Sequence, residues 1–177
     1  MTYKGAINWE GAVGGYSSVT NSVISSGRAP GVLIWNSANV DFTDNVVANF
    51  VQHGIWVKGT QNLKINNNWL HHVPPDTNVN PRMFAYPIMA EYEIGGISVS
   101  DGVKNAEVKN NVVSGTFFAG FHFIPDQCDE RSHERIVDPT YIFEGNVAHS
   151  ISGYGAVAKK VTNDCTIVHG FKAYKVT

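Results

Sequence analysis

The sequence of 177 residues predicts a single all-β domain, and composition is the first of three observations behind that prediction. Val occurs 22 times and Ile 13 times, against only 3 Leu. Because β-branched side chains fit the pleated surface of a strand, this balance argues against an all-α fold. The 17 Asn and 17 Gly residues are typical of a chain with many tight turns and left-handed backbone positions.

A repeat with a spacing of 23 or 24 residues is the second observation. Five short apolar segments each begin with Gly, at residues 31–34, 54–57, 96–99, 120–123 and 155–158. A unit this short cannot bury its own apolar face, whereas a stack of such units can. The repeat therefore predicts a right-handed parallel β-helix of about six coils. We expect residues 1–177 to form one domain that is a piece of a longer chain.

A column of asparagines is the third observation. An Asn precedes three of the repeat glycines by nine residues, at Asn45, Asn111 and Asn146, and Asn68 follows Asn45 by 23 residues. In a solenoid of this spacing, the four side chains share one corner of successive coils. Asn tolerates a bent backbone, and stacked amides can hydrogen-bond to one another. We therefore expect a structural ladder made of Asn45, Asn68, Asn111 and Asn146.

Alternation along the strands predicts which side chains face the core. Positions one and three after each repeat glycine, such as Ile55 and Val57, are expected to point inward. The position between them is expected to point outward, which gives the column Leu33, Trp56, Ser98, His122 and Val157. On the strand before each ladder Asn, the outward column is Asp41, Lys64 and Glu107, whose alternating charges we interpret as a solvated surface.

Two insertions interrupt the repeat, at about residues 73–94 and 125–139. The first contains four prolines, three aromatic residues and two methionines. The second contains Cys128 and a charged stretch, residues 129–135. Long loops on a regular scaffold often carry binding residues. The alternative is that each insertion is a flap packed over a side wall.

Charge and hydropathy exclude several classes of function. Charged residues make up 16% of the chain and the formal net charge is −2, which argues against a nucleic-acid-binding protein and a basic membrane-surface helix. No apolar run of the ~20 residues that a membrane span needs is present. The first residues lack a charged segment followed by an apolar one, so we expect no signal peptide in this chain.

The sequence contains no clear catalytic or metal-binding motif. Polysaccharide-cleaving enzymes need paired carboxylates on neighbouring coils, and no outward column stacks two acids. Asp101 and Asp126 follow strand ends on consecutive coils, which is a weak signal. His71 and His72 are adjacent and are therefore expected to point to opposite faces of a strand, and no zinc-type spacing occurs. We therefore predict no catalytic residues, no metal and no cofactor, while leaving enzymatic activity open.

The order of several motifs resembles the parallel β-helix region of fibrocystin and fibrocystin-like proteins. The most specific motifs are Gly-Phe-His-Phe at 120–123, Cys128 after it, and Asn-Val-Ala-His-Ser at 146–150. The resemblance covers roughly residues 14–175. It implies a segment of a large single-pass cell-surface protein with a long ectodomain, found on cilia and other membranes. It therefore implies an extracellular or cell-surface location.

The resemblance also implies a disulfide. The family pattern has one Cys after the Gly-Phe-His strand and another that opens a later coil, which Cys128 and Cys165 match. A bond between them would tie the second insertion to the barrel. The alternative is two free buried thiols.

The function that we expect from the sequence is a non-enzymatic extracellular interaction module. Its partners would be flanking domains of a larger ectodomain, another surface protein or a glycan, but no nucleic acid. Aromatic side chains on a flat β-wall suit sugar rings or another protein domain. The predicted binding surface combines the outward column with the first insertion: Leu33, Trp56, His122, Met83, Phe84 and Tyr86. The alternative is a carbohydrate-active β-helix enzyme, a polysaccharide lyase or a glycoside hydrolase.

Overall fold

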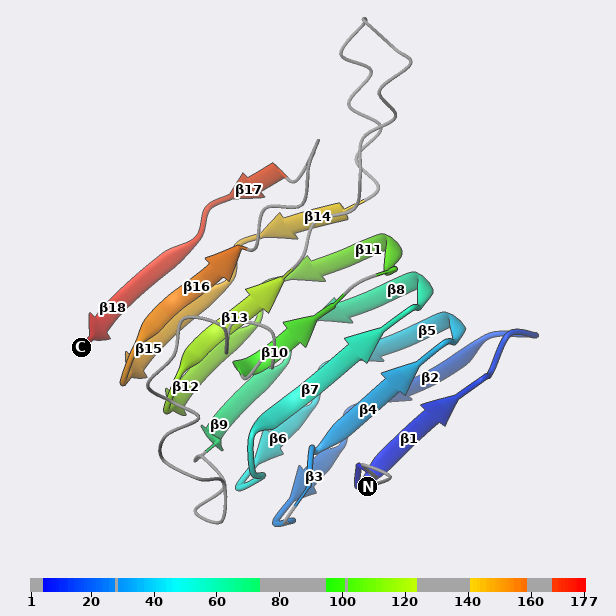
Figure 1. Cartoon of the computed structure of the whole chain (residues 1–177), viewed down its shortest axis with the longest axis horizontal. Coiled ribbons are helices and arrows are strands. Elements are labelled where there is room, and N and C mark those ends of the chain that lie inside the picture. Colours follow the sequence, from blue (N-terminus) through cyan, green and yellow to red (C-terminus); the bar gives the residue numbers. More distant parts are fainter. Residues whose placement is uncertain (1–4, 28, 74–94, 101, 124–140, 159–166) are drawn as a thin grey trace, which may run out of the picture.

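The computed structural model describes residues 5–27, 29–73, 95–100, 102–123, 141–158 and 167–177. These residues form eighteen β-strands that wind into six coils, each made of three strands (Figure 1). Within the described ranges there is no helix with the length and apolar character needed to cross a membrane. The predicted all-β parallel β-helix with about six coils is confirmed.

Three six-stranded sheets form the walls of the solenoid, and the strand pairings among the described residues are parallel. Sheet A contains β1 (Ile7–Glu10), β4 (Val32–Trp35), β7 (His53–Lys58), β10 (Gly95–Val99), β13 (Ala119–Phe123) and β16 (Tyr154–Ala158). Sheet B contains β2 (Ser17–Thr20), β5 (Ala38–Thr43), β8 (Gln61–Asn66), β11 (Lys104–Lys109), β14 (Tyr141–Glu144) and β17 (Ile167–His169). Sheet C contains β3 (Val23–Ser25), β6 (Val46–Ala48), β9 (Trp69–Val73), β12 (Val112–Thr116), β15 (Val147–Ile151) and β18 (Lys172–Val176).

The strand register places equivalent repeat positions directly above one another. In sheet A, Leu33 pairs with Trp56, which pairs with Ser98, and the column continues through His122 to Val157. In sheet B, Lys64 lies between Asp41 and Glu107. Both predicted columns are therefore correct in register, because a repeat of fixed length returns each position to the same place on the wall.

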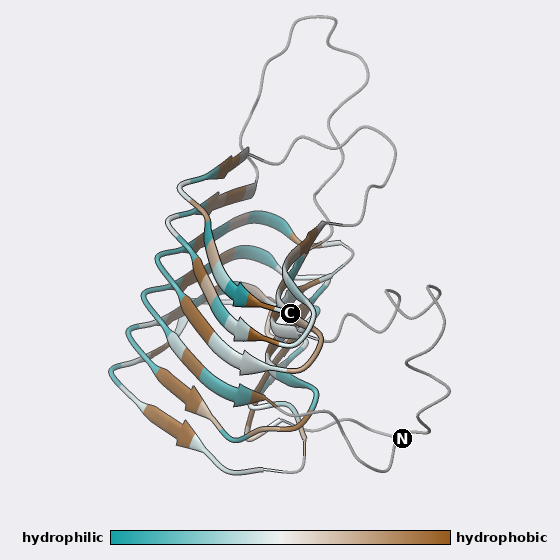
Figure 2. Ribbon diagram, turned by 90° about the vertical axis from the view of Figure 1, so that its left-hand side faces the viewer, coloured by the Kyte–Doolittle hydropathy of each residue, from teal (hydrophilic) through white to brown (hydrophobic). Residues whose placement is uncertain are grey.

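The core fills the space between the three sheets. All the side chains predicted to point inward from sheet A are at most 4% exposed: Val32, Ile34, Ile55, Val57, Ile97, Val99, Phe121 and Phe123. Hydrophobic stretches recur in successive coils (Figure 2). Towards the last coils, the rings of Phe121 and Phe143 meet edge to face at 5.2 Å, and Phe171 lies 5.7 Å from Phe143. Such aromatic pairs add to the stabilisation from burial.

The repeat glycines lie where a side chain would collide with the core and with the next coil. A Cβ on Gly54 would be 2.8 Å from the carbonyl oxygen of Gly96, and a Cβ on Gly96 would be 2.9 Å from that of Gly120. The same hypothetical Cβ atoms would lie 2.5 Å from Leu70 Cδ2 and 2.2 Å from Val113 Cγ1. Any side chain at these positions would clash, because adjacent coils and the core approach the backbone closely there.

The corners between sheets are formed by residues in the left-handed conformation. Between sheets B and C, the residue before each ladder position has φ of 51–64°, as at Asn21, Asp44, Asn67, Asn110 and Gly145. At or just after the carboxyl ends of the sheet C strands, the same conformation recurs at Ser26, Asn49, His72, Gly115, Ser150 and Lys175. Asn, Asp and Gly adopt this conformation at low cost, which explains the abundance of Asn in the chain.

The two predicted insertions fall largely outside the described residues, which resume at Gly95 and at Tyr141. Their proposed role in binding therefore stays a prediction. The fold provides three walls with a fixed register, and these walls determine which side chains share a surface.

Candidate functional site

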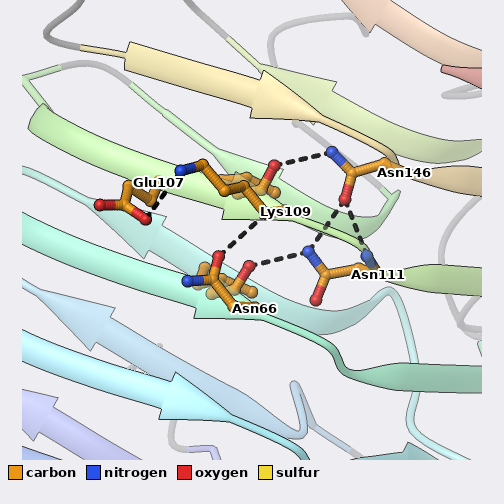
Figure 3. A network of polar contacts seen from close by, with 7 residues as sticks. Asn66, Glu107, Lys109, Asn111 and Asn146 are labelled. Carbon is orange, nitrogen blue, oxygen red and sulfur yellow. Dashed lines mark hydrogen bonds and ion pairs between the residues drawn. The ribbon is translucent and has the colours of Figure 1, made fainter. Parts of the chain in front are cut away.

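The predicted Asn ladder is present and buried. Asn45, Asn68, Asn111 and Asn146 are each at most 1% exposed. The Nδ2 group of each donates to a backbone carbonyl of the preceding coil, for example Asn111 to Ile65 at 2.8 Å and Asn146 to Val108 at 2.7 Å (Figure 3). In Asn45, Asn68 and Asn111, Nδ2 also donates to the next amide of the ladder, as from Asn111 Nδ2 to Asn146 Oδ1 at 3.0 Å.

The ladder uses the full hydrogen-bonding capacity of its inner amides. Asn111 Oδ1 accepts from both the backbone N–H and the Nδ2 of Asn68, at 2.9 and 3.0 Å, while its own Nδ2 donates twice. A carboxamide has two N–H donors and an oxygen with two acceptor sites, so nothing is left for a ligand. This ladder is structural.

The outer face of sheet A corrects one expectation. The column Leu33, Ser98 and His122 points away from the core, but Leu33 is 2% exposed and the other two are 0% exposed. The expectation that Leu33 and His122 form an exposed surface is therefore wrong. Strand alternation fixes the direction of a side chain, but it does not determine whether that face of the sheet is covered. Trp56, in the same column, remains partly exposed.

A buried histidine lies beside Trp56, and the sequence analysis did not single it out. The rings of His53 and Trp56 stack at 4.9 Å with an interplanar angle of 13°, and Trp56 Nε1 donates to Ser100 Oγ at 3.2 Å. His53 is 3% exposed, and burial, with a smaller contribution from the charge of His122, lowers its pKa from 6.5 to about 3. His53 is therefore neutral in the folded protein at physiological pH.

His53 is expected to make the protein less stable in mild acid. The unfolded chain takes up a proton near pH 6.5, whereas the folded chain does so only near pH 3. The contribution of this group to stability is therefore complete above pH 6.5 and decreases as the pH falls towards 3, by about 1.4 kcal/mol per pH unit. Between pH 7 and pH 5, the loss from this group is about 2 kcal/mol.

Urea unfolding of the wild type and of His53→Phe at both pH values measures this effect. Phe keeps an aromatic ring against Trp56 but does not titrate, so the variant should lose about 2 kcal/mol less than the wild type. His169→Phe, on exposed β17, is the matched control. Equal losses in the wild type and in His53→Phe would contradict the assignment.

The outer face of sheet C carries a second histidine column. His71, Ser114, His149 and Tyr174 pair in register along four coils. His71 Nδ1 lies 2.9 Å from Ser114 Oγ, and the rings of His149 and Tyr174 stack at 5.0 Å. Ser114 is 2% exposed, and its Oγ also reaches the carbonyl of Leu70 at 3.4 Å. We interpret this column as a stabilising surface ladder, since the Ser114 hydroxyl is buried and bonded within the wall.

The outer face of sheet B carries an open groove of about 150 Å³. Its lining includes Tyr16, which directly precedes β2, and residues from β5, β8 and β11: Asn39, Asn62, Lys64, Asn105 and Glu107. The three asparagines form a second ladder, with Asn105 Nδ2 donating to Asn62 at 2.6 Å and Asn62 Nδ2 donating to Asn39 at 2.8 Å. Sequence analysis missed this ladder, although its members recur at the same 23- and 43-residue intervals as Asn45, Asn68 and Asn111.

Two acids on the sheet B face, Asp41 and Glu107, have polar partners. The Tyr16 hydroxyl donates to Asp41 Oδ2 at 2.7 Å, and this hydrogen bond is the main cause that raises the pKa of Tyr16 above 10.0. Lys109 Nζ lies 3.2 Å from Glu107 Oε2 (Figure 3). The predicted column Asp41, Lys64 and Glu107 alternates in sign as expected. The face is therefore polar with nearly balanced charge.

Several predicted site residues lie outside the described residues. Met83, Phe84 and Tyr86 belong to the first insertion, and Cys128 and Cys165 to ranges 124–140 and 159–166. Their roles in binding and in a disulfide stay predictions. Over the part of the chain that the structure describes, no group of three or more His, Cys, Asp or Glu side chains is placed to hold a metal ion.

Comparison with known proteins gives a family and two relatives. Residues 4–129 match the model of the family described as right handed beta helix region. The chain is 29% identical to mouse (Mus musculus) fibrocystin over 160 residues and 25% identical to dog (Canis lupus familiaris) fibrocystin over the same length. Each match covers 90% of this chain and 3% of the relative, so the chain spans only a small part of the length of these relatives. No solved structure matches the chain.

Proposed function

The chain belongs to the right-handed β-helix family, and on this premise we propose that it is a non-enzymatic interaction module of a fibrocystin-like surface protein. The module would present its walls and loops at fixed spacing to a flanking domain, to another surface protein or to a glycan. Its location would be extracellular, as the likeness to fibrocystin suggests.

The register of the charged residues is the observation that carries the proposal. Hydrolysis of a glycosidic bond needs two carboxyl groups, one on each side of that bond. Among the strand residues whose pairing is described, no acid lies opposite another acid. Glu107 pairs with Lys64 across the strands and bonds to Lys109, while Asp41 accepts a hydrogen bond from Tyr16. These acids are engaged in surface contacts, which supports a binding role.

The small share of the relatives that the chain covers supports contact with flanking domains. At 3% of the length of each relative, this region has many neighbours in such a protein. In the last described coil, Tyr154, Val168, Tyr174 and Val176 are 36–57% exposed. The first described coil also has exposed apolar side chains, at Val13, Tyr16 and Val23, and such side chains suit contact with another folded segment.

The proposal predicts binding without turnover. The purified chain, incubated with a panel of acidic and neutral polysaccharides, should release no reducing ends and no unsaturated products. On an array of neutral and acidic glycans, or with purified mouse fibrocystin segments that flank the matched region, it should bind at least one probe. Of the predicted surface, Trp56 retains partial exposure, so Trp56→Ala tests that face.

The outcomes separate the two classes of function. Product release that disappears in Glu107→Gln would make the protein a carbohydrate-active enzyme and would overturn the proposal. Absence of binding to every glycan and every flanking segment would also overturn it. Binding that persists in Trp56→Ala would leave the proposal standing and exclude the sheet A face as the contact.

A further inference from the structure

We propose that the groove on the outer face of sheet B binds a neutral glycan through the ladder Asn39, Asn62 and Asn105 and the ring of Tyr16. This inference deepens the proposed function, on which it rests, by naming a site and a class of ligand. The strands that carry the groove, β5, β8 and β11, lie side by side on one wall (Figure 1).

The exposed ladder of Asn39, Asn62 and Asn105 differs from the buried ladder because some of its hydrogen-bond donors and acceptors remain unused. In the exposed ladder, Asn62 Nδ2 donates once, to Asn39, and Asn62 Oδ1 accepts once, from Asn105. Asn39 Nδ2 in turn donates to the Gly15 carbonyl at 3.1 Å. A carboxamide can donate twice and accept twice, so Asn62 retains one N–H and one acceptor site beyond the ladder. The buried ladder retains none at Asn68 or Asn111.

The spare donors and acceptors recur at the spacing of the coils. Adjacent strands of a sheet are about 4.8 Å apart, so the wall offers a donor and an acceptor together at that interval. This interval is comparable to the length of one sugar ring in an extended chain. Vicinal hydroxyl groups of a sugar both donate and accept, and they match a fixed carboxamide in that respect.

The backbone holds these amides in a fixed position before any ligand binds. Asn39, Asn62 and Asn105 have φ of 57°, 54° and 52°, and their strands are paired on both sides. The amide-to-amide hydrogen bonds further restrict side-chain rotation. A preorganised site loses less conformational entropy on binding than a flexible one.

Tyr16 supplies the apolar contact that a sugar ring needs. It lies one coil before Asn39 in the same column, since Ser17 pairs with Val40, and it is 68% exposed. The hydrogen bond from its hydroxyl to Asp41 fixes the orientation of the ring. The apolar face of a sugar ring can then stack on the exposed aromatic ring of Tyr16.

The charges around the groove favour a neutral ligand over an acidic one. Lys64 lies between Asp41 and Glu107 in register, and Glu107 also contacts Lys109. A sulfated or uronic-acid chain along this wall would meet carboxylates on the coils either side of Lys64. The two lysines balance the two acids, so the wall has no net positive charge that would attract a polyanion.

Replacement of Asn62 by Gly removes the central amide without straining the backbone, because Gly adopts a φ near 54° readily. Asn67→Gly is the matched control, since Asn67 is in the same coil, is exposed, and has φ of 57°, but does not line the groove. Tyr16→Ala tests the aromatic contact. Unfolding by urea checks that all three variants are folded.

The binding experiment uses ¹⁵N NMR of the side-chain amides. The probes are cellohexaose, mannohexaose and chitohexaose as neutral chains, with a heparin-derived hexasaccharide and hexagalacturonate as acidic chains. At least one neutral probe should shift the carboxamide signals of Asn39, Asn62 and Asn105. Asn62→Gly and Tyr16→Ala should each weaken that binding at least fivefold, whereas Asn67→Gly should leave it unchanged.

Three results would overturn the inference. They are shifts caused only by the acidic probes, neutral binding that Asn62→Gly does not weaken, and no shift with any probe. In the second case the proposed function stands and the contact lies elsewhere, for instance at Trp56. In the third case the proposed function stands only if a flanking fibrocystin segment binds, so the two failures can be told apart.

Discussion

Asn111→Ala is expected to lower the free energy of unfolding by about 3–5 kcal/mol. The Asn111 carboxamide makes four hydrogen bonds, and its Oδ1 serves two donors of Asn68, the backbone N–H and Nδ2. Asn68 is 1% exposed, so solvent cannot replace the missing acceptor without entering the corner. Each buried donor or acceptor left without a partner costs roughly 1–3 kcal/mol.

Chemical denaturation with circular dichroism measures this loss, and Asn66→Ala is the matched control. Asn66 is in the same coil as Asn68, but its Oδ1 accepts a single hydrogen bond, from the Lys109 backbone N–H at 3.0 Å, and the side chain is partly exposed. Its replacement should cost about 1 kcal/mol or less. Similar losses in the two variants would mean that the buried ladder is not a main source of stability.

Gly96→Ala is expected to destabilise the protein by about 3 kcal/mol, an effect at the upper end of the range for overpacking. The added Cβ would lie 2.2 Å from Val113 Cγ1 and 2.9 Å from the Gly120 carbonyl oxygen. Val113 is completely buried, and the carbonyl belongs to the backbone of the next coil. The carbonyl oxygen cannot move without displacing a paired strand, and the completely buried Val113 side chain has little room to rotate.

A double-mutant cycle tests this mechanism. Val113→Ala removes the methyl group that the new Cβ would meet, so Gly96→Ala should cost less in the Val113→Ala background than in the wild type. Gly14→Ala is the control, because no atom lies within 4 Å of its hypothetical Cβ and its φ is not left-handed. Additive effects in the cycle would refute the contribution of the Val113 contact and leave the clash with the Gly120 carbonyl oxygen as the explanation.

The architecture was predictable because a repeat converts sequence intervals directly into spatial columns. Asn45 and Asn68 stack because they are 23 residues apart, and the same interval aligns Asp41 with Lys64. Even the insertion between Asn68 and Asn111 does not disturb the column, since the chain returns to register at β10. The repeat interval therefore predicts which residues stack on one another in each of the three sheets.

The surfaces were harder to predict than the walls. Alternation gave the correct direction for Leu33 and His122, but their burial depends on what lies over the sheet, which periodicity does not encode. The exposed ladder at Asn39, Asn62 and Asn105 carried the same intervals as the buried one. It was missed because each residue of the buried ladder is followed by two apolar residues that mark the repeat, whereas Asn39, Asn62 and Asn105 have no such marker. His53 was missed because it precedes the repeat glycine and so falls outside the counted strand positions.

The buried amides also give the solenoid an electrical direction. From Asn45 to Asn146, every amide-to-amide hydrogen bond has its donor on the earlier coil and its acceptor on the later one. The local dipoles therefore add along the long axis, and neighbouring bonds polarise one another, strengthening each by roughly 10–30%. The two ends of this column are therefore not equivalent. The first amide keeps an unused acceptor site, and the last amide keeps an unused N–H donor. The stack is therefore polar along its axis. A segment that packs on the first coil should supply a hydrogen-bond donor to the ladder, and one that packs on the last coil should supply an acceptor.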